Sequence, residues 1–236
     1  MSKIIFVVHG MRSGDINERL KSFIYSSFHN IYEDYEIAFL ESETENLDQV
    51  MQSNIQQGTR TFYIAPVLLF QAKHFLIDIP NVIDDLKREH KDIEVHLSKP
   101  IGNHLSMKKH LITKINQHKE SDMAVVVLAH GSSIYKEPDS ALKDLCKDIQ
   151  NPVYPLTIYG SLNYKKYLPD LDKFYSKILI VPYFMFDGFL VNKTKIEIKE
   201  MALNTEITYT DAINFDEGMQ EAIRDHLQKL REISYV

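Results

Sequence analysis

Residues 3–10 read KIIFVVHG, and residues 124–131 read AVVVLAHG. Each stretch is an apolar run, rich in β-branched residues, that ends in a histidine followed by a glycine. Such a run is typical of a strand buried on both faces of a parallel sheet, and the polar pair marks where a loop begins. Because the two stretches lie about half the chain apart, the sequence predicts two similar halves.

Each half continues with strand and helix patterns in alternation. The first half has further strand patterns at 35–41, 59–70 and 93–101, and helix patterns at 16–32, 46–58, 80–90 and 104–118. The second half has further strand patterns at 153–160, 177–186 and 206–213, and helix patterns at 138–149, 162–174, 193–204 and 216–230. This alternation predicts an α/β protein of two similar domains, 1–118 and 119–236, each a parallel sheet flanked by helices.

The composition narrows the class of protein. With 236 residues, 44% hydrophobic and 25% charged, the chain has the make-up of an ordinary soluble globular protein. Its formal net charge of −6 disfavours general binding to nucleic acid. No apolar run approaches the roughly 20 residues of a membrane span and no signal-peptide pattern occurs, so the cytoplasm is the expected compartment. The single cysteine, Cys146, lies on the apolar side of a helix pattern and is predicted to be an inert packing residue.

Three polar residues follow predicted strands of the first half. His9 ends VVHG, Glu41 ends AFLE, and His74 comes after PVLLF. Ligands of open parallel sheets bind beyond the carboxyl ends of the strands, so these side chains can converge on one cleft. Two imidazoles and a carboxylate suit Fe²⁺, Co²⁺, Ni²⁺ or Zn²⁺, and they also supply bases that titrate near neutral pH. Glu43 and Glu45 follow so closely that the three acids can equally form a solvated turn.

The second half keeps only part of this set. Of the three positions, only the first histidine is repeated, as His130, whereas the other two are taken by Gly160 and Leu190. The expected metal site therefore belongs to the first half and is mostly lost in the second.

The segment that carries the second histidine, residues 66–80, reads PVLLFQAKHFLIDIP. Its apolar start predicts a strand that stops near Phe70. The following QAKHFLID is predicted to be a loop over the mouth of the sheet, and Pro80 is predicted to open the next helix.

Several common site motifs are missing. Neither G-x-x-x-x-G-K-[ST] nor a G-x-G-x-x-G after a strand occurs, so the sequence predicts neither ATP nor NAD as a cofactor. With one cysteine, the chain also lacks the cysteine cluster of a structural zinc site.

The pattern as a whole resembles a known family. Residues 9–12 read HGMR, residues 38–41 read AFLE, and residues 66–80 keep the spacing from the first proline through the histidine to the closing Asp-Ile-Pro. With its weaker repeat in the second half, this pattern is similar to the ATP-independent class II tetrapyrrole chelatases of the CbiX/SirB type. The chain departs from the family pattern at Met11, where serine is common, and at Ala72, where glycine is common.

The resemblance implies two α/β domains around one cleft and a sirohydrochlorin ferrochelatase, a lyase that inserts Fe²⁺ into the macrocycle to give siroheme. Cobalt or nickel chelation belongs to the same family. In either case the divalent metal and the sirohydrochlorin-type tetrapyrrole are the substrates. His9 and His74 match the family's metal-handling histidines, and Glu41 matches a glutamate near them.

Further residues beside this set are expected to bind the tetrapyrrole. Arg12 and Lys73 can clamp its carboxylates, while Met11, Phe75 and His130 can line its pocket. The expected partners are the tetrapyrrole and the metal ion, without nucleic acid or membrane, and no particular oligomer is predicted.

The residues alone also fit other functions. A tetrapyrrole or metal carrier without turnover would use the same groups, and a metal-dependent hydrolase would use two histidines and a carboxylate to activate water. A regulatory relative that merely kept the fold is a third possibility, which the intact first-half set disfavours.

Overall fold

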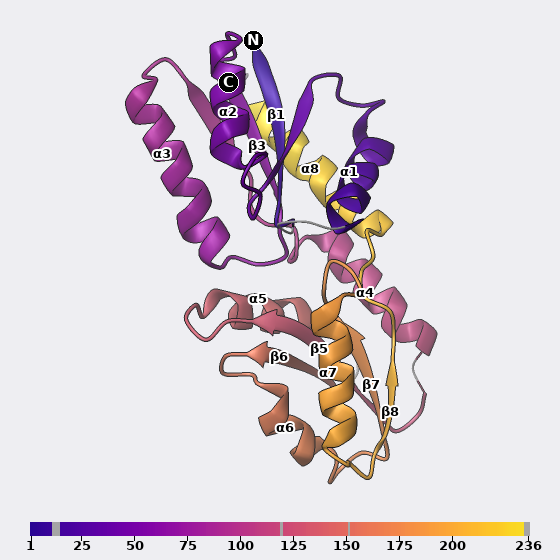
Figure 1. Ribbon diagram of the computed structural model, residues 1–236. Coiled ribbons are helices and arrows are strands. Elements are labelled where there is room, and N and C mark those ends of the chain that lie inside the picture. Colours follow the sequence, from indigo (N-terminus) through magenta and orange to yellow (C-terminus); the bar gives the residue numbers. More distant parts are fainter. Residues whose placement is uncertain (11–14, 119, 151, 234–236) are drawn as a thin grey trace. The chain divides into compact units, whose positions relative to one another are not determined.

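Figure 1 shows the computed structural model of the protein, which describes residues 1–10, 15–118, 120–150 and 152–233. The chain forms two compact units, each with one four-stranded parallel sheet flanked by helices. The predicted fold class is therefore confirmed.

Strands and helices alternate along the whole chain. The first half contains β1 (Ser2–Val8), α1 (Asp15–Phe28), β2 (Tyr35–Phe39), α2 (Leu47–Gln56), β3 (Thr61–Val67), the π-helical turn η1 (His74–Asp78), α3 (Ile79–Glu89), β4 (Glu94–Leu97) and α4 (Leu105–His118). The second half contains β5 (Met123–Gly131), α5 (Glu137–Cys146), β6 (Val153–Tyr159), α6 (Tyr164–Leu171), β7 (Lys177–Pro182), α7 (Phe189–Glu200), β8 (Glu206–Tyr209) and α8 (Glu217–Ile233). Among the described residues, no helix is both long enough and apolar enough to cross a membrane.

The two sheets have the same strand order. It is β2-β1-β3-β4 in the first sheet and β6-β5-β7-β8 in the second, with every neighbouring pair parallel. In the first sheet, Val8 at the end of β1 pairs with Phe39 of β2 and with Val67 of β3. The ends of these three adjacent strands are therefore level, and the segments that leave them start at one edge of the sheet.

The first sheet is buried on both faces, as its continuous apolar strands predict. One face packs against α2 and α3 in a cluster that includes Ile5, Met51 and Leu86. Side chains alternate along a strand, so the next residue, Phe6, points to the other face. There its ring stacks on Phe28 of α1 with the ring centroids 5.2 Å apart. Fully burying one such side chain stabilises the fold by about 1.5–3 kcal/mol.

The segment after β3 differs from the prediction. The strand ends at Val67 rather than near Phe70, and the open loop predicted after it is wrong over its second part. Residues His74–Asp78 form the π-helical turn η1, which runs directly into α3. Phe75 of this turn is partly buried against the first core, and this apolar contact favours an ordered turn over a solvated loop.

The compact units do not coincide with the halves of the repeat. The first unit comprises Met1–Ile101 with Gln220–Val236, and the second comprises Gly102–Met219. The predicted domains, 1–118 and 119–236, are the halves of the repeat. In the compact units, α4, which ends the first half, belongs to the second unit, and most of α8 belongs to the first.

The packing of α4 explains its place in the second unit. Its apolar side chains Met107, Leu111 and Ile115 are buried. Met107 and Leu111 line one small cavity together with Tyr183, which follows β7. The hydroxyl of Tyr183 donates to the carbonyl of Gly102, which precedes α4, at 2.5 Å. The last helices of the two halves, α4 and α8, thus belong to different units.

We predict that the Cys146 thiol is unreactive in the native protein. Cys146 ends α5, is 8% exposed, and burial raises its pKa to about 12 although Lys108 lowers it slightly. Because the thiolate is the reactive form, a colorimetric disulfide reagent at mildly alkaline pH should label the native protein at least about 100-fold more slowly than the denatured protein. Equal labelling rates in the two states would contradict the buried position.

Candidate metal site

Three residues that follow adjacent strands come together at the C-terminal edge of the first sheet. His9 follows β1 directly, Glu41 follows β2 after one residue, and His74 opens η1 after β3. One ligand atom of each lies within 4.8 Å of the other two. The first half thus gathers two imidazoles and a carboxylate in a donor set suited to a divalent transition metal.

The two imidazole rings meet edge to face. The ring centroids of His9 and His74 are 4.7 Å apart, and the ring planes are nearly perpendicular at 88°. The Nε2 atom of His74 lies 3.5 Å from Oε1 of Glu41, and these two side chains are 24% and 36% exposed. Since His9 is exposed as well, solvent and an incoming ion have access to the group.

Backbone hydrogen bonds hold Glu41 beside His9. The amide of Leu40 donates to the carbonyl of Val8 at 3.0 Å, and the amide of Glu41 donates to the carbonyl of His9 at 3.3 Å. These bonds extend the pairing of β1 with β2 beyond the strand ends. The position of the carboxylate is therefore set by the sheet and not by a free loop.

The chain turns sharply after His9. Gly10 has a φ of +64°, and a Cβ atom there would lie 2.6 Å from the ring of Phe39, so only glycine fits without strain. Nδ1 of His9 lies 2.9 Å from the carbonyl oxygen of Gly10. Because a carbonyl can only accept, Nδ1 carries the proton, and Nε2 of the neutral ring keeps the lone pair that a metal needs.

The surroundings of His74 favour its neutral form. Burial lowers the pKa of His74, and the nearby His9 lowers it further, whereas Asp78 and Glu41 raise it. The lowering effects of burial and His9 outweigh the raising effects of the two carboxylates, so the pKa of His74 lies below its ordinary value of 6.5. A neutral imidazole near neutral pH can bind a metal or accept a proton.

Asp78 is the residue of this site whose role was missed in the sequence. Its Oδ2 atom lies 2.7 Å from Nδ1 of His74, and Nζ of Lys73 donates to its two carboxylate oxygens at 2.8 and 3.0 Å. Lys73, expected to clamp substrate carboxylates, is thus bound to a carboxylate of its own chain. The spacing of His74 and Asp78, four residues apart, would have signalled the contact had the segment been read as helical.

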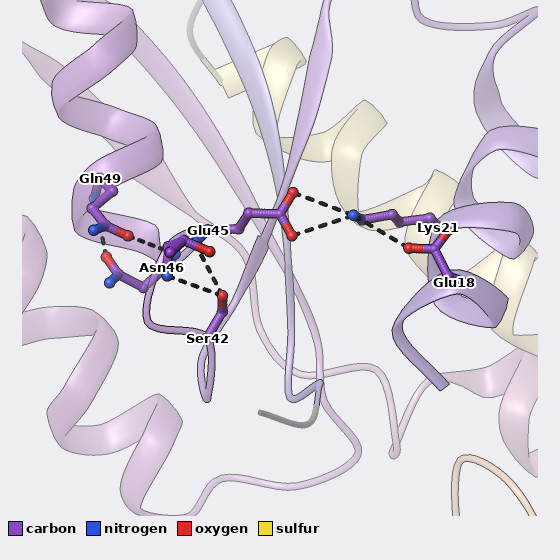
Figure 2. A network of polar contacts seen from close by, with 7 residues as sticks. Glu18, Lys21, Ser42, Glu45, Asn46 and Gln49 are labelled. Atoms are coloured by element: carbon purple, nitrogen blue, oxygen red, sulfur yellow. Dashed lines mark hydrogen bonds and ion pairs between the residues drawn. The ribbon is translucent and has the colours of Figure 1, made fainter. Parts of the chain in front are cut away.

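Figure 2 shows that Glu45, in the acidic turn after β2, pairs with Lys21 of α1. Ser42 Oγ accepts from the amide of Glu45, whose carboxylate oxygens each lie 3.2 Å from Nζ of Lys21 on α1. Burial lowers the pKa of Lys21, but its pairing with Glu45 and Glu18 outweighs this and leaves the pKa raised. Glu45 is therefore paired away from the histidines, and Glu41 is the acid of the turn that meets them.

The remaining predicted site residues are Met11, Arg12, Phe75 and His130. Met11 and Arg12 fall outside the described residues. Phe75 is partly buried and packs against the first core. His130 is exposed at the end of β5, where its ring centroid lies 5.1 Å from that of Tyr159.

The second half lacks matching ligands at two of the three positions. The strand register places Tyr159, and not the expected Gly160, opposite Glu41, because Val8 pairs with Phe39 in the first sheet and Ala129 pairs with Thr157 in the second. Leu190, in the place of the second histidine, packs against the second core. Within the part of the chain that the structure describes, His130 belongs to no group of three possible metal ligands.

Comparison with known proteins places the chain among chelatases. The sequence profile of the CbiX family matches residues 3–118 and again residues 124–230. The chain is 25% identical over 258 residues to a sirohydrochlorin cobaltochelatase of Priestia megaterium, covering 97% of this chain and 80% of that protein. It is 27% identical over 248 residues to a sirohydrochlorin ferrochelatase of Bacillus subtilis, covering 97% and 90%.

Solved structures share the fold. SirB from Bacillus subtilis with Fe³⁺ superposes with a TM-score of 0.86 at 21% identity, over 99% of this chain and 97% of that one. A CbiX described as the terminal enzyme for siroheme biosynthesis in denitrifying bacteria gives a TM-score of 0.66 at 12% identity, over 96% and 98%.

We predict a pH-dependent contribution of His74 to stability. Because its pKa is lowered on folding, the unfolded chain binds the proton more readily. The free energy of unfolding should therefore fall as the pH drops below about 6.5 towards the folded pKa, and this loss should be absent above that range. His74→Gln removes the effect, so the wild type should lose stability relative to this variant as the pH falls.

Urea unfolding of both proteins from about pH 8 to about pH 5 measures this difference. His118→Gln, at the exposed end of α4, serves as the control and should follow the wild type. A wild type that gains stability relative to His74→Gln on acidification would mean that folding raises the pKa.

Proposed function

Because this chain belongs to the CbiX family, we propose that it is a sirohydrochlorin ferrochelatase, which inserts Fe²⁺ into sirohydrochlorin to give siroheme without ATP. The observation that carries the proposal is the group of His9, Glu41 and His74, whose ligand atoms lie within 4.8 Å of one another. The ferrochelatases of Bacillus subtilis and Priestia megaterium, to which the chain is similar over nearly its whole length, support it.

Metal insertion makes three demands on a protein. The macrocycle must lose two pyrrole protons, the ion must shed water, and the ring must bend so that a nitrogen lone pair reaches the metal. None of these steps needs ATP when the product is stable. The protein must therefore offer bases and a metal site with open coordination positions, because a closed cage would keep the ion.

The candidate site offers both. In the proposal, His9 and His74 hold the incoming Fe²⁺ through Nε2 and, when neutral, accept the pyrrole protons. Glu41 is a third ligand or passes protons to solvent, and its charge favours a divalent cation. The access of solvent to these side chains suits an ion that must enter and then leave with the product.

Residues around this set are proposed to bind the tetrapyrrole. Arg12 and Met11 follow the first histidine in sequence, and Arg12 can pair with the carboxylates of the macrocycle. Lys73 can also bind the carboxylates of the macrocycle, since its side chain is 65% exposed. Phe75 and His130 are proposed to line the pocket.

Cobalt chelation is the second candidate. The alignment with the sirohydrochlorin cobaltochelatase of Priestia megaterium covers 97% of this chain at 25% identity, and imidazole and carboxylate ligands bind Co²⁺ and Ni²⁺ at least as readily as Fe²⁺. A carrier that binds the same substrates without turnover is separated from both enzymes by the rate of insertion.

Anaerobic insertion of Fe²⁺, Co²⁺ and Ni²⁺ into sirohydrochlorin, followed by absorbance, tests the proposal. The wild type should exceed the spontaneous rate, with Fe²⁺ preferred, and His9→Ala and His74→Ala should each lower kcat/KM by about 100-fold or more. Glu41→Gln should lower it less, because the amide can still bind the ion.

Glu43→Gln is the matched control, since Glu43 lies exposed in the same turn, and it should retain wild-type activity. Full activity in His74→Ala would remove this residue from the reaction. Binding of metal and macrocycle without acceleration would identify a carrier, and a preference for Co²⁺ would identify a cobaltochelatase.

A further inference from the structure

The turn that carries His74 has an unusual helical geometry. Residues His74–Asp78 form a π-helical turn, closed by the amide of Ile79 donating to the carbonyl of His74, five residues back. Single π turns inside helices are rare and are frequent at functional sites. Pro80 follows directly. In a continuous α-helix its ring would crowd the carbonyl of Leu76 four residues back, and a wider turn relieves this clash.

The carboxylate of Asp78 is free of any helix-capping role. Asp78 joins η1 to α3 with helical φ and ψ of −68° and −49°, and its side chain makes no capping bond. It instead lies 2.7 Å from Nδ1 of His74 and accepts from Lys73. The side chain is thus turned back towards the metal site.

This contact determines which nitrogen of His74 is available. An ionised carboxylate can only accept, so Nδ1 of the neutral ring must carry the proton, and the lone pair resides on Nε2. Nε2 is the atom that lies 3.5 Å from Glu41. Nζ of Lys73 donates to both oxygens of the same carboxylate and holds it beside the imidazole.

The turn is anchored on its downstream side. Ile79, Ile83 and Leu86 of α3 are all buried in the first core. A π turn contains one residue more than an α turn. If the same residues formed an α turn instead, those upstream of it would rotate by about 100° relative to α3. His74 lies upstream and would turn away from the other two ligands.

We propose that Asp78 is a positioning residue which, held by Lys73 and by the π turn before Pro80, fixes His74 with Nε2 directed at the metal. The proposal rests on the proposed function in one respect, that a divalent metal is the ion bound. Asp78 would act like the carboxylates that orient metal-binding histidines in other proteins. Loss of such a carboxylate typically weakens metal binding by about 10- to 100-fold.

Nitrogen NMR of the metal-free protein tests the tautomer directly. In ¹⁵N-labelled protein at a pH where the ring is neutral, long-range proton–nitrogen correlations should show Nδ1–H for His74, assigned by its disappearance in His74→Gln. Asp78→Ala should lose this fixed form. Asp78→Asn, which is nearly isosteric, keeps the fold and should show a weakened preference, because an amide is a poorer acceptor than a carboxylate.

Titration with Co²⁺, followed by its visible absorption, gives the second readout. Asp78→Ala should bind Co²⁺ about 10- to 100-fold more weakly, with Asp78→Asn in between. Pro80→Ala should also bind more weakly while its unfolding midpoint in urea is maintained. Asp84→Asn, an exposed carboxylate on the same helix, is the control and should match the wild type.

The two proposals fail in different ways. If Asp78→Asn and Asp78→Ala keep both the Nδ1–H form and wild-type Co²⁺ affinity, the positioning role is overturned while metal insertion by the wild type still stands. Wild-type affinity in Pro80→Ala would overturn the part assigned to the π turn. A wild-type protein that binds Co²⁺ but inserts no metal would instead overturn the chelatase.

Discussion

Parallel pairing of β1 with both β2 and β3 is the constraint on which the candidate site depends. It levels the ends of three strands at Val8, Phe39 and Val67, and each chain segment that leaves this edge delivers one ligand. Advancing one strand by two residues would keep its buried face buried but would move its ligand by about 7 Å. That is more than the 4.8 Å within which the three ligand atoms lie. The register that buries the core therefore also determines whether the three side chains of the candidate site come together.

The duplicated fold shows how one scaffold supports a site in one half only. Both sheets have the same strand order, and both first strands end in a histidine and a glycine. Tyr159 takes the place of Glu41, and at Leu190 the side chain packs against the second core. The second half thus has an aromatic and an aliphatic side chain where the first half has possible metal ligands. Two of the three ligands are missing, so a single substitution would not restore the group.

Much of the fold and the three central residues could be predicted from the sequence, because buried parallel strands and strand-end polar residues leave a local pattern. His9, Glu41 and His74 were each identifiable from the residues just before them. The part of Asp78 was not, since it depends on a π turn that no periodicity reveals and that was read as a loop. Nor could the sequence choose among the acids of the turn after β2, because the pairing of Glu45 with Lys21 joins distant residues.

The sequence by itself determined the two α/β halves, the parallel sheets and the three side chains of the candidate site, because apolar runs and turn residues act over a few neighbouring positions. Only the tertiary structure decided which acid faces the histidines, which nitrogen of His74 is left for a ligand, and to which compact unit α4 and α8 belong. These outcomes depend on contacts between segments far apart in the chain. The strength of these contacts depends on distance and burial in the folded protein, so a local sequence pattern does not predict them.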